Sequence, residues 1–242
     1  MTRYDPELVS CVIPVYNGAR FVAASIESVL AQAYRPLEVI VVDDGSTDGT
    51  EDVLAGFGDR IRTFFQPNAG PSAARNRGVA EARGGWLTFQ DADDLWVPDK
   101  LERQMECFRR NPSIDLCVGY LQNFWEPELR EIEERARDTW LAQPHLAHGP
   151  PLMLMRRELF DRIGPFDPAL RTGEDTDWHF RAREAGIVTE CVPDVLIRRR
   201  RHGRNLTANW NASAEDMFTM LKRSIGRRRV APAAPPAPPA SE

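Results

Sequence analysis

Apolar and polar positions follow two alternating patterns along the first part of the chain. The run from Val9 to Val15 has the composition of a strand, and the next segment, ARFVAASIESVLAQAY, repeats apolar residues at helical spacing. LEVIVV is a mostly β-branched run, as expected for a strand that is covered on both faces, and it stops at the turn-rich segment DDGSTDGT. This alternation predicts a mostly parallel sheet flanked by helices.

The same cycle continues with the strand IRTFFQ, the helix SAARNRGVAEA and the strand WLTF. A helix with one apolar face is expected from about Pro98, followed by the strand IDLCVGY. LMLM predicts another strand, and a short helix after it is expected to end at Gly164. EDTDWHFRAREAG predicts a helix, and VTECV and VLIR predict two short strands.

Two segments depart from this alternation. Residues 121–143 are polar and rich in Glu and Arg with weak periodicity, which indicates a variable insertion or a mobile helix. Residues 213–230 predict a C-terminal helix, and the proline-rich tail at 231–242 is expected to be disordered. The predicted fold class is therefore α/β, as a single domain with a disordered C-terminal tail.

Composition narrows the possible partners. The net charge of -5 and the isoelectric point near 5.5 argue against a protein whose main partner is nucleic acid. The four cysteines lie far apart without a CxxC pair and are expected to be free thiols in a reducing cytoplasm. The N-terminal residues lack the pattern of a signal peptide, and no apolar run approaches the ~20 residues of a membrane span. We therefore expect a cytoplasmic protein.

The segment WLTFQDADDLW concentrates three carboxylates directly after a predicted strand. In an extended chain Asp91 and Asp93 point to the same side, where they repel each other unless a cation joins them. Oxygen ligands of this kind suit Mg²⁺ or Mn²⁺, with substrate phosphates completing the shell. The simpler alternative is stabilisation of the following helix N-terminus, which Asp94 or Asp99 could provide alone.

Polar residues also follow the other predicted strands, at the edge where open α/β sheets bind ligands. Each has a simple local alternative, because Asn17-Gly18 reads as a turn and Asp43 could cap a helix. Their agreement across four strand ends nevertheless favours a binding site. The residues are Tyr16, Asn17, Asp43, Asp44, Asn68, Arg75, Asp91 and Asp93.

Two later segments carry further candidate chemistry. Glu174 and Asp175 begin a predicted helix after a glycine, so they either stabilise the helix N-terminus or supply a general base. In RRRRHGRNLT, His202 follows four arginines. This segment is either a solvated basic loop or a site where arginine neutralises a diphosphate and His202 is available to a metal ion.

Taken together and in order, these motifs resemble glycosyltransferase family 2. The resemblance rests on VSCVIPVYNG, EVIVVDDGSTDGT, GPSAARNRG, FQDADDLW, GEDTDW and RRHGRNLT, and it covers the chain from about Val9 to Thr207. It implies the Rossmann-like GT-A fold and inverting transfer of a sugar to an acceptor hydroxyl. The implied donor is a nucleotide-diphosphate sugar, with UDP favoured, and the implied cofactor is Mn²⁺ or Mg²⁺.

The resemblance also implies how the donor is bound. It places Pro14, Tyr16 and Asn17 along the nucleotide. It assigns recognition of the base to Asp44 and Arg75.

The remaining matched positions concern the metal and the reaction. Asp91 and Asp93 match the DxD motif that binds the nucleotide and the metal, with Asp93 as the principal metal ligand. Asp175 matches the catalytic base, and Glu174 supports the acceptor side.

The last matched positions lie in the basic loop. Arg200 and His202 match a loop that closes over the diphosphate, where His202 ligates the metal. The chain departs from the family pattern at Arg199, where an aromatic residue is common, and this leaves the register of Arg200 open.

The implied organisation is a nucleotide-sugar-binding half, residues 1–110, and an acceptor-facing half with the catalytic base, residues 111–212. Acceptor choice is expected to reside in residues 121–151, but the sequence does not identify the acceptor as a glycan, lipid, peptide or small molecule. The basic segment MFTMLKRSIGRRR could contact an anionic membrane, such as the inner membrane face, or could be a terminal helix with a solvated face.

Three other functions compete with this interpretation. A receiver-like phosphotransfer domain relies on a later lysine, and neither Lys100 nor Lys222 is suitably placed. A nucleotidyltransferase would carry a glycine-rich basic loop, which PVYNGARF matches poorly. A non-catalytic nucleotide-sugar-binding protein stays open, because the presence of the acids does not by itself establish turnover.

Overall fold

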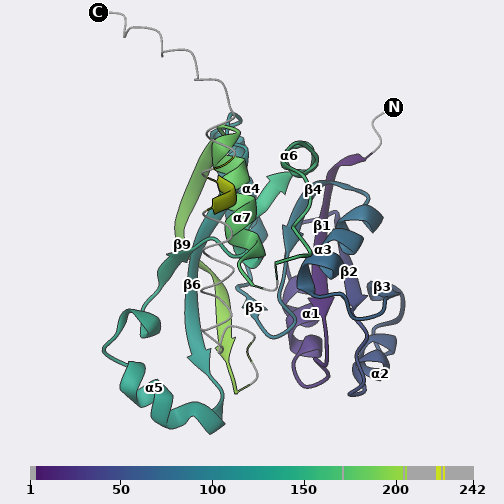
Figure 1. Ribbon diagram of the computed structural model, residues 1–242, viewed down its shortest axis with the longest axis vertical. Helices are drawn as coiled ribbons and strands as arrows, with labels where there is room; N and C mark the ends of the chain where they lie inside the picture. Colours follow the sequence, from purple (N-terminus) through teal and green to yellow (C-terminus); the bar gives the residue numbers. More distant parts are fainter. Residues whose placement is uncertain (1–3, 171, 204, 206–221, 225, 227–242) are drawn as a thin grey trace, which may run out of the picture.

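A nine-stranded sheet forms the centre of the computed structural model, which describes residues 4–170, 172–203, 205, 222–224 and 226 (Figure 1). The strand order is β3-β2-β1-β4-β8-β6-β9-β5, and β7 pairs with β6. The strands are β1 (Asp5–Val15), β2 (Leu37–Asp43), β3 (Arg62–Phe65), β4 (Gly84–Phe89), β5 (Leu95–Trp96), β6 (Leu116–Trp125), β7 (His145–Ala147), β8 (Leu154–Arg156) and β9 (Thr189–Arg201). The helices are α1 (Val22–Leu30), α2 (Thr50–Ala55), α3 (Pro71–Glu81), α4 (Lys100–Arg110), α5 (Arg130–Ala136), α6 (Arg157–Ile163) and α7 (Glu174–Glu184).

The parallel part of the sheet is its first half. Strands β3, β2, β1 and β4 are all parallel neighbours, as the alternation of strands and helices predicts. In the second half β6 and β9 pair in parallel, whereas β8 is antiparallel to both β4 and β6, and β5 is antiparallel to β9. The predicted α/β class with flanking helices is confirmed, with the sheet mixed overall.

Helices cover both faces of the sheet and form two cores. Successive residues of β1 point to opposite faces, so Cys11 and Ile13 belong to one core and Val12 to the other, and all three are fully buried. The first core includes side chains from α1, α2 and α4, and the second includes side chains from α3, α6 and α7. This arrangement places α3 and α7, which carry predicted site residues, on the same face.

Helix α3 packs unusually close to β1 at Gly78. A Cβ atom at this position would lie 2.3 Å from Cγ1 of Val12, so only glycine permits the observed separation. The helix begins at Pro71, after Gly70 adopts a φ of 90°. The close packing fixes α3, and with it Arg75 three residues before Gly78, against β1.

The structure corrects two sequence-based predictions about strands. VTECV and VLIR are not separate strands but parts of β9, because Pro193 lies where the β6–β9 register shifts between the pairs Val118–Cys191 and Tyr120–Val195. Residues 121–125 belong to β6 and not to an insertion. The alternation of apolar and polar residues does not reveal this part of the strand, because a polar residue, Asn123, occupies a buried position.

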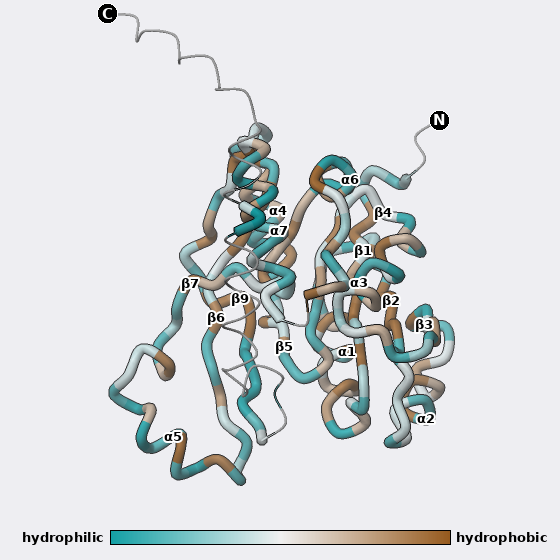
Figure 2. Tube along the Cα trace, viewed as in Figure 1, coloured by the Kyte–Doolittle hydropathy of each residue, from teal (hydrophilic) through white to brown (hydrophobic). Residues whose placement is uncertain are grey.

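The remainder of the predicted insertion projects from the sheet around α5 (Figure 1). Figure 2 shows this segment as mostly hydrophilic with short hydrophobic interruptions, and Ile132 and Trp140 are exposed. Strands β5 and β7 within the described chain had not been predicted, since each has at most three residues.

The predicted C-terminal helix lies largely outside the described residues, and the predicted disordered tail lies wholly outside them. Within residues 213–230, Lys222 to Ser224 and Gly226 are helical. Ser224 Oγ donates a hydrogen bond to the Glu184 carboxylate at the end of α7. Among the described residues, no helix is both long enough and apolar enough to span a bilayer.

Candidate active site

The carboxyl ends of β1, β2 and β4 meet at one edge of the sheet. Because these strands are parallel, the segments beginning at Tyr16, Asp44 and Gln90 emerge on the same side. Backbone hydrogen bonds continue past the strand ends, with Asp44 N donating to Val15 O at 2.8 Å and Gln90 N donating to Val12 O at 3.0 Å. The predicted gathering of polar strand ends is therefore present.

Asn17 joins the loop after β1 to the loop after β2. Its backbone N–H donates to Ser46 Oγ at 2.8 Å, and its Oδ1 accepts the Thr47 N–H at 2.8 Å. Asn17 adopts a φ of 50°, which Asn tolerates better than most residues. On the same loop Tyr16 is exposed, and Pro14 before it is half-buried.

Asp44 fixes the segment that leads into α3. Its carboxylate is buried and accepts hydrogen bonds from Gln66 Nε2 at 2.8 Å, Ala69 N at 2.9 Å and Gly70 N at 2.7 Å. Both carboxylate oxygens thus bind the chain itself. The structure places Asp44 as the residue that sets where α3 begins.

Arg75 on α3 connects two predicted acids. Its guanidinium donates to Asp91 Oδ1 at 2.8 Å and to Glu174 Oε1 at 2.6 Å, while the side chain is only 7% exposed. Burial opposes the arginine charge, but Asp91 and Glu174 more than offset it and raise the pKa of Arg75. Burial raises the pKa of Glu174, and the neighbouring charge of Asp175 adds to this, whereas the Arg75 guanidinium acts in the opposite direction without cancelling the shift.

Two buried side chains, Ser25 and Gln90, hold the acidic loop after β4 through hydrogen bonds to its backbone. Ser25 Oγ on α1 donates to the Asp91 carbonyl at 2.9 Å, and Gln90 Nε2 donates to the Asp94 carbonyl at 2.6 Å and to Ser25 Oγ at 3.1 Å. Asp94 itself is buried and accepts the Arg200 N–H at 2.8 Å. Burial, followed by the charges of Asp93 and Asp91, raises the pKa of Asp94 well above its usual range.

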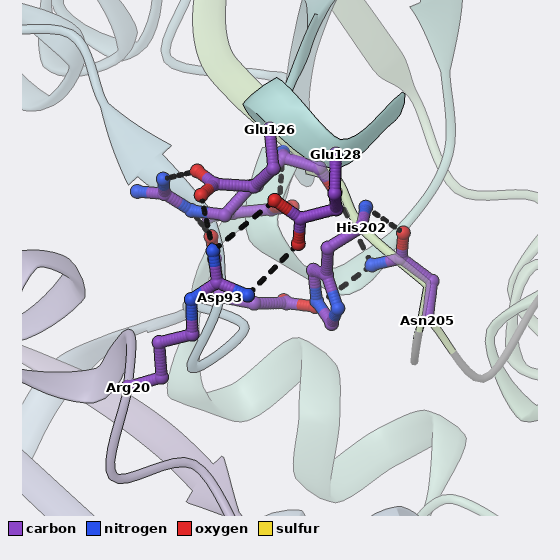
Figure 3. Close-up of polar contacts among 8 residues, drawn as sticks. Arg20, Asp93, Glu126, Glu128, His202 and Asn205 are labelled. Carbon is purple, nitrogen blue, oxygen red and sulfur yellow. Dashed lines mark hydrogen bonds and ion pairs between the residues drawn. The ribbon is translucent and has the colours of Figure 1, made fainter. Parts of the chain in front are cut away.

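Asp93 meets His202 from the end of β9. His202 Nε2 and Asp93 Oδ2 are 3.0 Å apart, and Asn205 Nδ2 donates to the same oxygen at 3.0 Å (Figure 3). Asn205 Oδ1 in turn accepts the His202 N–H at 2.8 Å. Two predicted metal ligands that are 109 residues apart in the sequence therefore lie in contact.

Arg200 stabilises this contact by binding the backbone of Asp93. Its Nε donates to the Asp93 carbonyl at 2.9 Å, and its guanidinium forms an ion pair with Glu126. The guanidinium also lies 4.7 Å from the ring centres of both Phe21 and Phe124. Arg200 is thus enclosed by the protein, with 12% of its side chain exposed.

Arg20, Phe21 and Glu126 also lie at this site, although none was predicted from the sequence. Arg20 and Phe21 directly follow the Asn17 loop. Their position shortly after a predicted strand is the sequence feature that could have identified them as site residues. Glu126 carries no such signal, because its place is determined by the pairing of β6 with β9. Its carboxylate binds both Arg20 and Arg200.

Asp175 lies in the first turn of α7. Its Oδ1 accepts the Thr176 N–H at 2.7 Å, and a Cβ at Gly149 would lie 3.9 Å from its Oδ2. One turn later, His179 Nε2 lies 2.6 Å from the His148 carbonyl and fixes the segment beside Asp175. Burial lowers the pKa of His179 to about 4, so the ring is neutral and Nε2 donates this hydrogen bond.

Six of the predicted site residues thus form two linked clusters. Arg75, Asp91 and Glu174 form one, and Asp93, Arg200 and His202 form the other, joined through the Asp91–Asp93 segment. Among the described residues, no group of three or more His, Cys, Asp or Glu side chains could hold a metal ion. A carboxylate and an imidazole nitrogen that meet at 3.0 Å nevertheless fit Mn²⁺ or Mg²⁺ when diphosphate oxygens complete the shell.

Comparison with known proteins gives one family and one fold. Residues 10–164 match the family model described as Glycosyl transferase family 2. Over 233 residues the chain is 41% identical to a Bacillus subtilis protein named "Putative teichuronic acid biosynthesis glycosyltransferase TuaG", which covers 90% of this chain and 88% of the relative. The family match and this relative agree over most of the described chain.

Solved structures with low identity share the architecture. The 1–349 portion of S. aureus TarS, solved with UDP-GlcNAc, has a TM-score of 0.73 at 18% identity, covering 93% of this chain and 68% of that one. The mannosyltransferase PcManGT of Pyrobaculum calidifontis, solved with GDP-Man and Mn²⁺, has a TM-score of 0.67 at 24% identity, covering 96% and 66%. This chain spans only 40% of a longer TarS chain. At these identities the likeness concerns the fold.

Proposed function

The chain belongs to glycosyltransferase family 2, has the GT-A fold and is a glycosyltransferase enzyme. From this premise we propose that it moves a sugar from a nucleotide-diphosphate donor to an acceptor hydroxyl, with inversion at the anomeric carbon and with a divalent metal ion bound.

The contact between Asp93 and His202 carries this proposal. The two side chains are 109 residues apart in the sequence, yet Oδ2 and Nε2 lie 3.0 Å apart at the carboxyl edge of the sheet. A carboxylate and an imidazole that converge on one point are suited to share a cation. Helix capping explains neither residue, because Asp99 and not Asp93 precedes α4.

Asp93 and His202 would hold Mn²⁺ or Mg²⁺. When bound, the metal supplies positive charge for the two phosphates and for the negative charge that grows on the leaving group. Asp91 adds a second carboxylate beside this position, where Arg75 fixes one of its oxygens. The PcManGT complex with Mn²⁺ supports a divalent ion in this fold.

UDP is the expected nucleotide. Support comes from TarS, which has the same fold and was solved with UDP and with UDP-GlcNAc. The PcManGT complex contains GDP-Man, so GDP is the alternative to be tested beside it. In this chain the joined loops at Asn17 and Thr47, with the exposed ring of Tyr16, would bind the nucleoside side of the donor.

Asp175 would act as the general base. It accepts the proton of the acceptor hydroxyl while that oxygen bonds to the anomeric carbon from the face opposite the diphosphate. The bond from the anomeric carbon to the diphosphate breaks, and the electron pair leaves with the nucleoside diphosphate. Because the attack occurs in one displacement, the configuration inverts without a covalent enzyme intermediate.

Glu174 would act beside the base without accepting the proton itself. Its carboxylate is held by Arg75, so it orients the first turn of α7 relative to the acidic loop. We place donor binding in residues 1–110 and acceptor binding in residues 111–212. The four free cysteines support a reducing compartment such as the cytoplasm.

The donor site is tested by thermal shift with UDP, GDP and dTDP, each with and without Mn²⁺. A nucleotide at ~100 times its Kd should add about 2.7 kcal/mol of stability. We expect a Mn²⁺-dependent shift with one nucleotide in the wild type, and its loss in Asp93→Asn. Absence of any shift in the wild type would overturn the donor site.

Turnover is tested with Asp175→Asn in a donor-consumption assay that uses the nucleotide-sugar identified by that screen. The variant should lose about 10²-fold or more in kcat while its Kd for the nucleotide stays unchanged. Asp59→Asn, at an exposed position on the donor half, is the matched control and should retain turnover. Full activity of Asp175→Asn would exclude it as the base and leave the non-catalytic binder as the alternative.

A further inference from the structure

Three side chains converge on the ring of Phe21. The guanidinium carbons of Arg20 and Arg200 each lie 4.7 Å from its centre, and the His202 ring centre lies 4.7 Å from it as well. Phe21 follows the Asn17 loop and precedes α1, so it lies between the donor loop and the Asp93–His202 pair. Arg20 is therefore next to the position proposed for the diphosphate.

The Arg20 guanidinium forms ion pairs with two carboxylates. Its Nη1 donates to Glu128 Oε1 at 2.8 Å, and its Nη2 donates to Glu126 Oε2 at 2.8 Å and to Glu128 Oε2 at 3.3 Å. Figure 3 shows Arg20 reaching toward Glu126 and Glu128 while His202 and Asn205 point toward Asp93. Arg20 thus binds three oxygens of two carboxylates, next to the position proposed for the diphosphate.

The two arginines differ in how firmly they are held. Arg200 is 12% exposed, lies between two aromatic rings and donates to the Asp93 backbone, so it cannot turn without disturbing the acidic loop. Arg20 is 58% exposed, and its guanidinium donates to the two glutamates. Exposed ion pairs contribute little to stability, so these contacts can be exchanged for another anion.

We propose that Arg20 is a ligand of the donor diphosphate, and that Glu126 and Glu128 hold it when no donor is bound. This inference rests on the proposed function of the same site. The planar guanidinium forms the same paired hydrogen bonds with carboxylate and with phosphate, so the glutamates present the oxygens that the diphosphate replaces. Glu126 retains Arg200 after the exchange, and Glu128 is the partner that Arg20 gives up.

The test compares diphosphate with monophosphate binding by calorimetry in the presence of Mn²⁺. UDP and UMP, with GDP and GMP in parallel, are titrated into the wild-type chain, Arg20→Gln and Glu128→Gln. Arg20→Gln should raise the Kd for the diphosphate about tenfold or more and change the Kd for the monophosphate less than about twofold. Glu128→Gln should lower the Kd for the diphosphate about two- to fivefold, because the competing carboxylate is removed.

Arg60→Gln is the matched control, since Arg60 forms an exposed double ion pair with Glu27 away from the site. It should change neither dissociation constant. Arg20→Lys keeps the charge but not the paired geometry and should fall between the wild type and Arg20→Gln. If Arg20→Gln binds UDP as the wild type does, or loses UDP and UMP equally, the assignment is wrong. If the wild type binds neither UDP nor GDP with Mn²⁺, the donor site itself is wrong and the Arg20 assignment falls with it.

Discussion

The guanidinium of Arg75 donates to Glu174 at 2.6 Å and so joins helix α3 to the first residue of α7. The contact crosses from the donor side of the sheet to the helix that carries Asp175, and both side chains are at most 10% exposed. A buried pair of this kind is costly to break from one side, because the remaining charge has no solvent to replace its partner. Arg75 therefore couples the relative position of α3 and α7 to the stability of the fold.

Arg75→Leu should lower the free energy of unfolding by about 3–5 kcal/mol, since it leaves buried Glu174 without its cationic partner. Urea unfolding at pH 7 measures the change. Arg60→Gln, at an exposed pair, should leave the free energy of unfolding nearly unchanged. An equal effect of the two substitutions would show that the Arg75 contacts are not buried as described.

The sequence predicted the fold where apolar periodicity and burial coincide. The buried parts of β1 and β2 coincide with the predicted apolar runs, so the limits of β2 and the end of β1 were nearly correct, whereas the largely exposed first residues of β1, 5–8, were not predicted. The prediction of strand limits failed where a polar residue is buried and where the pairing of two strands shifts register at a proline. Asn123 in β6 and Pro193 in β9 are these two cases, and neither property is visible in local periodicity.

The site was predictable to the extent that its residues follow strands or match family motifs. Asp93 and His202 were both candidates, and the structure brings them together. The contacts of Glu126 could not be anticipated, because they depend on how β9 registers against β6 and thereby places Arg200 beside the end of β6. Side-chain partners across a sheet depend on register, which a single sequence specifies only weakly here.

His202→Asn should weaken Mn²⁺-dependent nucleotide binding, because it removes the imidazole that meets Asp93. We expect the Kd for UDP in Mn²⁺ to rise about tenfold or more, the lower end of what loss of a metal contact costs. The Kd measured without metal should stay unchanged, which separates loss of the cation from loss of folding. His145→Asn, on β7, is the matched control and should bind as the wild type.

Gly78→Ala should destabilise the protein although alanine favours helices over glycine by about 1 kcal/mol. The added Cβ would lie 2.3 Å from Val12 Cγ1, so α3 must move from β1 at a cost of about 1–3 kcal/mol. Urea unfolding measures the net effect. Val12→Ala in the same chain makes room for the methyl group, so the double variant should be less destabilised than the sum of the two single variants. Strict additivity would contradict the close contact.

Lys100 should make stability depend on pH around neutrality. The side chain is fully buried, its Nζ donates to Gln104 Oε1 at 2.8 Å and to Thr88 Oγ1 at 3.2 Å, and it lies 4.1 Å from the centre of the Trp96 ring. Burial lowers the pKa of Lys100 from 10.5 to about 7. Hydrogen bonds to neutral acceptors do not replace the hydration that its charged form loses.

The sign follows from proton binding. Between about pH 7 and pH 10.5 the unfolded chain holds the lysine proton and the folded chain has released it, so the free energy of unfolding should rise with pH. The slope approaches about 1.4 kcal/mol per pH unit for a single proton. The stability from this group is thus complete above about pH 10.5 and is progressively lost as the pH falls toward about 7.

Urea unfolding of the wild type and of Lys100→Met at pH 7.0, 7.75 and 8.5 isolates this group. Burial raises the pKa of the Cys11 thiol, which acts in the opposite direction at higher pH and sets the upper limit of the range. Because the cysteine is present in both proteins, the difference between the two curves reports Lys100 alone. The wild type should gain stability relative to Lys100→Met as pH rises. A difference that is constant across the three values would mean that Lys100 keeps the same protonation state in the folded and unfolded chains.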